Sequence, residues 1–262
     1  MDERGLYVYG VVPSSAPGTV FDDVRGVDPS EAVTLVADGE VAAIVSTVRL
    51  DEFGEDAIHE NLRDARWLAE KARAHDDVLA AAVGRTTVVP FRFGAIYRDE
   101  QHVVDLLRER VDFASTLSRL DGAVELGVKA VVDVEALRGR LAAEHAVADD
   151  LPAGRAYMQR RQLARDLDEA VDRFAAECAQ ESHERLANVA RAARANPVQP
   201  LDDASSPRRM ILNGAYLVDA AAQAQFRDEV GAVARDRGDD GVDFELTGPW
   251  PPYNFAEGDE PS

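Results

Sequence analysis

The stretch VELGVKAVV, residues 124–132, shows most clearly which fold the second half of the chain adopts. Apolar residues stand at every second position, and a period of two predicts a β-strand with one buried face. These apolar positions are Val124, Leu126, Val128, Ala130 and Val132. We therefore expect a half-buried strand here and read the rest of the chain outward from it.

Helices and strands alternate after this strand. Three segments carry the amphipathic pattern of helices, and two carry the apolar runs that are typical of strands. In chain order, we expect helices at 135–146 and 155–184, a strand at 210–218, a helix at 220–235 and a strand at 242–247. Residues 186–194 fit either the end of the long helix or a further strand. In the second case the order is β-α-β-β-α-β, the ferredoxin-like split-βαβ order, whose antiparallel sheet carries helices on one face.

The first half of the chain has a similar mixture of patterns. Asp38-Gly39 lies between two apolar runs, and this dipeptide is the strongest short signal for a β-hairpin. Pro90 falls inside a strand-like run, so we expect it at a bulge or an edge of a sheet. The expected elements are strands at 6–12, 33–37, 41–48 and 86–93 and helices at 57–83 and 99–120.

Together these patterns predict an α+β protein with two domains, each ferredoxin-like or a variant of that fold. The expected N-terminal domain covers residues 1–120, and the C-terminal domain, with its additional long helices, covers residues 121–255. Residues 256–262 are expected to form an acidic, disordered tail.

The charge and the apolar content restrict the possible partners. The chain has 49 acidic and 29 basic residues, a net charge of −20, and such a surface repels nucleic acid and anionic lipid. The longest apolar runs fall well short of the roughly 20 residues that span a bilayer, so no membrane insertion is expected. The charged N-terminus is unlike a signal peptide, and the lone cysteine, Cys178, fits a reducing compartment, so we expect a cytoplasmic protein.

Signatures of catalysis are missing from the sequence. We find no phosphate-binding loop, dinucleotide fingerprint, metalloprotease motif or nucleophile elbow. The histidines are scattered, at His59, His75, His102, His145 and His183. Cys178 falls on the apolar stripe of its predicted helix and is expected to be buried. We therefore predict no enzyme activity, no cofactor and no catalytic metal.

Two segments are unusually rich in aromatic residues and prolines for their position. They are VVPFRFG, residues 88–94, and LTGPWPPYNF, residues 246–255. Such aromatics either pack on the protein itself or face a partner, so the second segment is read as closing the C-terminal domain, as a partner-binding surface, or as both. The candidate residues are Pro90, Phe91, Arg92, Phe93, Trp250, Tyr253 and Phe255.

Five blocks of sequence resemble the gas vesicle protein F/L family. They lie in the family's order along nearly the whole chain, and the last is the most specific. The blocks are LYVYGVV (6–12), VPFRFG (89–94), GRAY (154–157), NGAYLV (213–218) and TGPWPPYNF (247–255). They fit the F and the L members equally well.

This resemblance implies a minor, accessory protein of gas vesicle assembly, located with the vesicle. Members of the family are expected to bind the small hydrophobic shell protein and other accessory proteins. The resemblance transfers no catalytic residue. An acidic surface would keep a sticky shell subunit dispersed while an aromatic or edge-strand site holds it. The sequence carries no indication of the oligomeric state.

Two alternative functions remain open at this stage. Paired ferredoxin-like domains could form an enzyme with its active site in a cleft between the domains. They could also form a ligand-sensing regulator, a reading that rests on analogy of fold alone.

Overall fold

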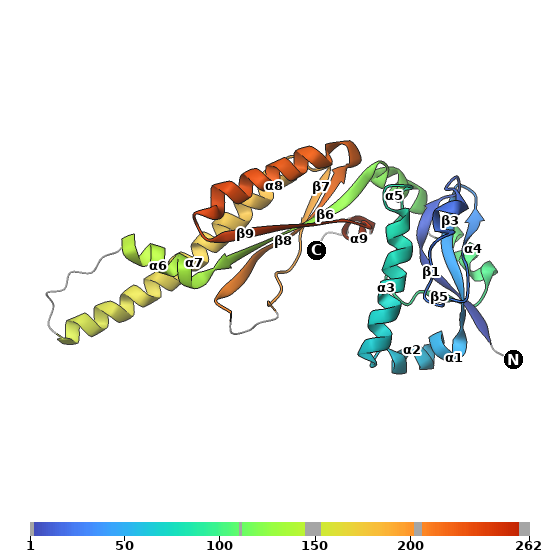
Figure 1. The fold of residues 1–262 in the computed structure, drawn as a ribbon, viewed down its shortest axis with the longest axis horizontal. Coiled ribbons are helices and arrows are strands. Elements are labelled where there is room, and N and C mark those ends of the chain that lie inside the picture. Colours follow the sequence, from blue (N-terminus) through green and yellow to red (C-terminus); the bar gives the residue numbers. More distant parts are fainter. Residues whose placement is uncertain (1–2, 110–111, 145–152, 202–205, 257–262) are drawn as a thin grey trace. The chain divides into compact units, whose positions relative to one another are not determined.

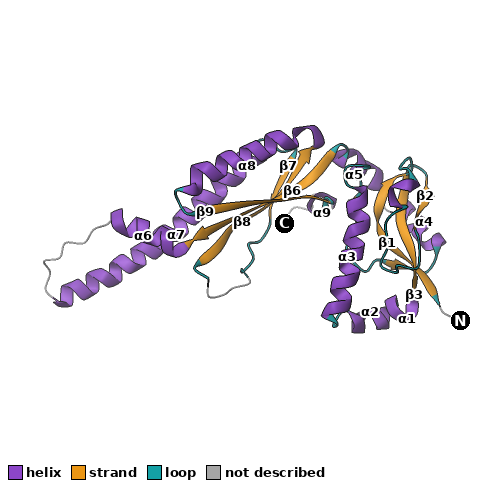
Figure 2. Ribbon diagram, in the orientation of Figure 1, coloured by secondary structure: helices purple, strands orange, loops and turns teal. Residues whose placement is uncertain are grey.

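The chain forms two compact units, each with its own sheet. The structure is a computed structural model that describes residues 3–109, 112–144, 153–201 and 206–256 (Figure 1). Unit 1 consists of Met1–Glu125 together with Pro249–Ser262, and unit 2 is Leu126–Gly248. Both sheets are antiparallel and are accompanied by helices (Figure 2), which confirms the predicted α+β class.

Unit 1 is built around a sheet with the strand order β2-β3-β1-β4, in which β5 also pairs with β1. Its elements are β1 (Arg4–Pro13), η1 (Gly18–Phe21), β2 (Val33–Asp38), β3 (Val41–Arg49), α1 (Leu50–Phe53), α2 (Glu55–Asn61), α3 (Ala65–Ala82), β4 (Val89–Pro90), β5 (Ile96–Tyr97), α4 (Glu100–Glu109), α5 (Phe113–Leu120) and α9 (Tyr253–Ala256). A short 3-10 helix, η1, replaces the first crossover helix of a ferredoxin-like domain, so unit 1 is a variant of that fold.

Strand β1 is central because its sequence is apolar on both faces. Tyr7, Val8 and Tyr9 follow one another and are each 0% exposed, a pattern that only a strand covered on both sides can have. Helix α3 lies on one face of the sheet and α4 on the other (Figure 1). Gly10 lets β4 approach closely, since a Cβ there would come within 2.6 Å of the Val89 carbonyl oxygen.

The hairpin and the edge proline are confirmed. Strands β2 and β3 pair antiparallel up to Asp38 and Val41, and Gly39 in the turn has φ +60°, a value that glycine adopts readily. The second edge of the sheet is an interrupted strand made of β4 and β5. Pro90 lies in β4 opposite Gly10, where its missing N–H removes no bond from the interior of the sheet.

The two helices predicted for unit 1 are each divided, and the predicted continuity was wrong. The side chain of Asp64 accepts hydrogen bonds from the N–H groups of Arg66 and Trp67. It therefore caps a new helix, α3, inside the segment predicted as one helix from 57 to 83. The segment from 99 to 120 forms α4 and α5, and residues 110–111 between them lie outside the described part.

Unit 2 has the predicted ferredoxin-like order. Its elements are β6 (Ala123–Asp133), α6 (Val134–Glu144), α7 (Ala153–Ala187), β7 (Ala192–Ala195), β8 (Arg208–Asp219), η2 (Ala220–Ala222), α8 (Gln223–Gly238) and β9 (Val242–Trp250), where β6 begins and β9 ends in unit 1. The strand order is β7-β8-β6-β9. Helices α7 and α8 contact each other and both contact β8, so they share one face of the sheet (Figure 1). The ambiguous segment 186–194 ends α7 and begins β7.

Cys178 lies in the apolar core of unit 2, as predicted. It is 1% exposed and packs in a cluster that includes Val171, Leu212 and Val242. Burial raises the pKa of its thiol, so Cys178 behaves there as a small apolar side chain.

The main difference from the predicted organisation concerns the C-terminal residues. The two units meet in sequence at Glu125 and Leu126, close to the expected boundary after residue 120. The segment from Pro249, by contrast, groups with unit 1 although it was expected in the C-terminal domain. The division into two domains stays a prediction, and the predicted acidic tail lies, apart from Ala256, outside the described residues.

Candidate functional site

The C-terminal segment, defined as residues 249–256, divides into a buried part and an exposed part. Pro251 and Pro252 are buried, and Phe255 is 6% exposed. Trp250, immediately before the two prolines, is 51% exposed. One short stretch thus combines a packing role with a large aromatic surface that faces solvent.

The buried part packs on unit 1. Helix α9 contacts β4 and α5, and Tyr253 packs against the core formed by β1 and α3. The prediction that Tyr253 and Phe255 close the C-terminal domain was therefore wrong, because the core that they cover belongs to the N-terminal unit. Strand β9 ends at Trp250, and Pro251 and Pro252 direct the chain into the short helix α9 rather than a further extended stretch.

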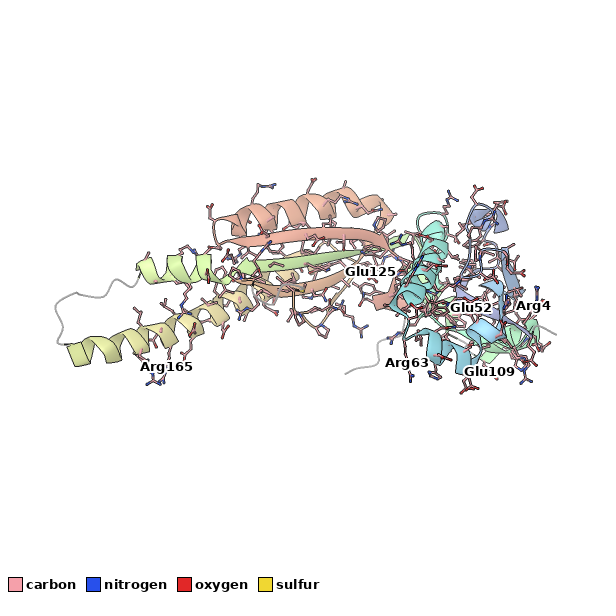
Figure 3. All side chains as sticks on the ribbon, turned by 60° about the horizontal axis from the view of Figure 1, so that its bottom comes forward. Arg4, Glu52, Arg63, Glu109, Glu125 and Arg165 are labelled. Atoms are coloured by element: carbon pink, nitrogen blue, oxygen red, sulfur yellow. The ribbon has the colours of Figure 1, made fainter. Side chains whose placement is uncertain are left out.

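A buried carboxylate fixes the start of α9. The backbone N–H of Asn254 donates to Glu125 Oε2 over 2.9 Å, and Asn254 Nδ2 donates to Glu125 Oε1 over 2.6 Å. Glu125, labelled in Figure 3, is 5% exposed. Burial raises the pKa of Glu125, and the two hydrogen bonds from Asn254 oppose that rise. The carboxylate thus binds a backbone group that would otherwise be unsatisfied at the beginning of the helix.

His75 of α3 connects three separate segments. Its Nδ1 lies 2.9 Å from Tyr7 Oη, and its Nε2 lies 3.1 Å from the Phe91 carbonyl oxygen and 3.2 Å from Tyr253 Oη. Burial lowers the pKa of His75, against the opposing effects of Asp76 and the Phe91 carbonyl. The ring is therefore neutral at pH 7 and has one donor and one acceptor nitrogen.

The partners of the His75 ring determine its tautomer. A carbonyl oxygen can only accept, so Nε2 carries the hydrogen and donates to Phe91, and Nδ1 accepts from the Tyr7 hydroxyl. Tyr7 Oη in turn accepts from the Gly94 N–H over 3.0 Å. Tyr253 donates to Asp76 Oδ1 over 3.3 Å. Every donor thereby finds an acceptor, which satisfies the buried polar groups.

The segment from Phe91 to Gly94 is the interruption in the edge strand. Phe91 donates its N–H to the Tyr9 carbonyl oxygen, and its ring lies 5.9 Å from that of Phe113. The Phe93 ring points into the core, 5.9 Å from the rings of both Tyr7 and His75. Arg92, between these two, is exposed.

Four of the predicted site residues share one cluster. Phe91, Phe93 and Tyr253 meet around His75, and Pro90 begins the bend that brings them there. Arg92 and Trp250 are the exposed members, and Phe255 is buried under α9. Tyr7, His75 and Glu125 were missed as site residues because each looked like an ordinary member of its element. The signal for His75 was its spacing with Lys71, Leu79 and Ala82 on one helix face.

The side chains around His75 connect β1, the segment at Phe91 and the C-terminal segment, and they act as hydrogen-bonding groups. Burial raises the pKa values of the Tyr7 and Tyr253 hydroxyls, and Asp76 adds to the effect at Tyr253. Both hydroxyls therefore stay protonated at pH 7 and act as hydrogen-bonding groups. Among the described residues, no group of three histidine, cysteine or acidic side chains is arranged to hold a metal ion. Over the same residues, no helix is both long and apolar enough to span a membrane.

The His75 network predicts a loss of stability on acidification. The pKa of His75 is lowered in the folded state, so the unfolded chain takes up its proton first. The contribution of neutral His75 is therefore complete above pH 6.5 and decreases as the pH falls below that value. We expect the free energy of unfolding to fall by up to about 1.4 kcal/mol per pH unit in that range.

The measurement is chemical unfolding between pH 8 and pH 5, compared with the His75→Gln variant. The glutamine side chain offers a donor and an acceptor but does not titrate. Glu125 has a raised pKa, which makes stability fall as the pH rises, but its effect is the same in both proteins and drops out of the difference. The difference in stability between the two proteins should narrow as the pH falls. A constant difference across this range would show that His75 does not titrate between the folded and unfolded states.

Comparisons of this chain with known proteins all lead to one protein family, and the matched region includes both aromatic segments. The model of the family described as "Gas vesicle synthesis protein GvpL/GvpF" matches residues 5–257. The chain is 34% identical to gas vesicle protein L of Streptomyces sp. (strain CB03234) over 97% of its length and 93% of that protein. It is 30% identical to gas vesicle protein F of the same strain, over 96% of this chain and 99% of that one.

Solved structures show the same fold. The crystal structure of GvpF from Anabaena sp. PCC7120 aligns with a TM-score of 0.70 at 21% identity, over 98% of each chain. GvpF from Microcystis aeruginosa aligns with a TM-score of 0.64, also at 21% identity, over 97% of this chain and 99% of that one.

These matches cover both units and the C-terminal segment. They identify the class of protein as a two-domain accessory protein of gas vesicles. The chain belongs to the GvpL/GvpF family of gas vesicle synthesis proteins. The resemblance inferred from the five sequence blocks is thereby confirmed. The family is one of structural and accessory proteins and is not known for enzymatic activity.

Proposed function

We propose that this chain acts in gas vesicle assembly by binding the small hydrophobic shell protein, together with other accessory proteins of the vesicle. Membership of the GvpL/GvpF family carries this proposal. The chain's net charge of −20 supports it, because a highly charged surface keeps a complex with an aggregation-prone subunit dispersed. We further propose that the protein is cytoplasmic and associates with the vesicle.

Trp250 is the residue that we assign to the contact with the shell protein. It is 51% exposed, in contrast to the buried prolines that follow it. Because Pro251, Pro252 and Phe255 hold the next residues against unit 1, the Trp250 side chain is presented on a rigid support. Tryptophan on such a support is a common anchor of protein interfaces, and its rigidity limits the entropy lost on binding.

The experiment replaces Trp250 with alanine and measures binding of the purified shell protein and thermal unfolding of the variant. We expect at least tenfold weaker binding, about 1.4 kcal/mol, with little change in stability because the side chain is half exposed. Leu62→Ala is the matched control, since Leu62 is an apolar side chain of unit 1 that is 40% exposed. Equal binding by wild type and Trp250→Ala would exclude Trp250 as the contact.

The assembly role has its own test. Deletion of the gene from a gas vesicle cluster should abolish or deform the vesicles, as scored by electron microscopy. Reintroduction of the wild-type gene should restore them. Normal vesicles in the deletion strain would contradict a role in assembly, whatever the binding experiment gives.

A further inference from the structure

A second surface of unit 1 lies apart from the cluster around His75. A groove of about 440 Å³ runs between the segment from Arg25 to Pro29 and the outer side of α3. The helix contributes Arg66, Arg73 and Asp77 to its lining, and the facing segment contributes Arg25. The groove therefore gathers three arginines from two parts of the chain that are distant in sequence.

Buried polar side chains fix the wall of this groove. The N–H of Val27 donates to Tyr9 Oη over 2.9 Å, and Lys71 Nζ donates to the Val27 carbonyl oxygen over 2.9 Å. Gly26 approaches so closely that a Cβ there would lie 2.3 Å from Tyr9 Oη. The wall is thus held in place before any ligand arrives, which lowers the entropy lost on binding.

The charge inside the groove is unbalanced. Lys71 is compensated by Glu52, labelled in Figure 3, at 3.3 Å and by Glu70 at 3.7 Å. Within the described residues, the guanidinium groups of Arg25, Arg66 and Arg73 have no ion pair or hydrogen bond. Some of the other arginines are paired with carboxylates, as Arg108 is with Asp38 and Arg185 with Glu229. The three arginines face only one further acidic side chain, Asp77, in a chain of net charge −20.

We propose that this groove binds an acidic peptide segment of another protein. Arg66 and Arg73 are seven residues apart on α3, so about 10 Å separates them along the helix axis. Three residues of a peptide in the polyproline II conformation rise about 9 Å and complete one turn, so the carboxylates of residues i and i+3 lie on the same side and can meet the two guanidinium groups. Arg25 on the opposite wall supplies a third charged hydrogen-bonding group, and guanidinium–carboxylate pairs are among the strongest such contacts.

A peptide fits this groove better than a nucleic acid does. The net charge of −20 repels every polyanion, and the repulsion grows with the number of negative charges, so a short segment with two or three carboxylates is repelled less than a nucleic acid with one phosphate per nucleotide. Asp77 and Glu70 at the same surface repel any negative group near them, but a peptide can place an uncharged residue opposite these carboxylates, whereas each nucleotide carries a phosphate. The proposal adds a binding surface that is independent of the assignment of Trp250.

The probe is a rhodamine-labelled hexaglutamate peptide, titrated with the full chain at low ionic strength and followed by fluorescence anisotropy. We expect saturable binding that weakens as salt is added, and no binding of a hexaglutamine peptide. The double variant Arg66→Glu, Arg73→Glu should bind at least tenfold more weakly. Arg85→Glu is the control, because Arg85 is an exposed arginine in the turn beyond the other end of α3 and lies outside the groove.

Circular dichroism verifies that each variant is folded, and Arg25→Gln, on the opposite wall, replaces the double variant if that one unfolds. The proposal is overturned by a failure of hexaglutamate to bind. It is equally overturned if Arg85→Glu weakens binding as much as the groove variants do, since the attraction would then be unspecific. Tighter binding of a single-stranded oligonucleotide of equal charge, lost in the same variants, would assign the groove to nucleic acid instead.

Discussion

Replacement of Phe255 by alanine is expected to lower the free energy of unfolding of unit 1 by about 3–5 kcal/mol. Phe255 is 6% exposed and lies in α9, which packs on β4 and α5. Removal of its ring leaves a cavity under a helix of only four residues. Total stabilities of small domains are about 5–15 kcal/mol, so the expected loss is a large part of the whole.

Hydrogen exchange locates the loss within the chain. Amides of β1 should lose protection in Phe255→Ala, while those of β8 in unit 2 keep theirs, because the segment packs on the first sheet. Trp250→Ala is the control in the same segment and should lower stability by less than Phe255→Ala, because the Trp250 side chain is 51% exposed. Loss of protection in β8 alone would mean that the segment stabilises the C-terminal unit, as its sequence first suggested.

Most strands of this protein could be predicted because their signals are local, although β5 (Ile96–Tyr97) was not predicted and the strand predicted at 86–93 is only Val89–Pro90. The apolar run at β1, the alternation along β6 and the Asp38-Gly39 hairpin each determine structure within about ten residues. The order of elements in unit 2, β-α-β-β-α-β once residues 186–194 are taken to include a strand, indicated a ferredoxin-like fold, since such chains have few ways to form one sheet.

The helix boundaries in unit 1 were harder to predict. The apolar spacing continues through Leu62 and Ala65, and this continuity concealed the break. The decisive feature is one side chain, Asp64, whose carboxylate binds two backbone N–H groups at the start of α3. A helix-capping residue within a continuous apolar pattern is therefore stronger evidence for a helix boundary than the pattern is for one unbroken helix.

The packing of the C-terminal segment could not be read from the sequence. Its aromatics and prolines identify residues that must be covered, but the pattern contains no information on which sheet covers them. The answer depends on partners more than a hundred positions away, since Tyr253 bonds His75 and Asn254 bonds Glu125. His75 was also underrated because a polar residue on a helix is usually solvated, and only its spacing with Lys71 and Leu79 placed it inside.

Replacement of Tyr7 is expected to be as damaging as that of Phe255. Tyr7 is 0% exposed, and its ring lies 5.9 Å from Phe93 and 4.8 Å from Tyr9. Tyr7→Ala removes this aromatic contact and the hydroxyl together, and we expect a loss of about 3–5 kcal/mol in urea unfolding. The variant is expected to be largely unfolded in unit 1 if that unit has ordinary stability.

Tyr7→Phe separates the hydroxyl from the ring. It leaves the Gly94 N–H and His75 Nδ1 without their partner inside the protein, at an expected cost of about 1–3 kcal/mol. Tyr216→Phe is the matched control, because Tyr216 is also 0% exposed and bonds Nδ1 of a histidine, His183, over 2.9 Å. His183 is only half-buried, so water can replace the lost hydroxyl and the cost should be smaller. Two results would contradict this expectation: an equal loss of stability in Tyr216→Phe and Tyr7→Phe, or no loss in Tyr7→Phe. Either would show that the hydrogen bonds around His75 do not stabilise unit 1 and that its stability comes from ring packing alone.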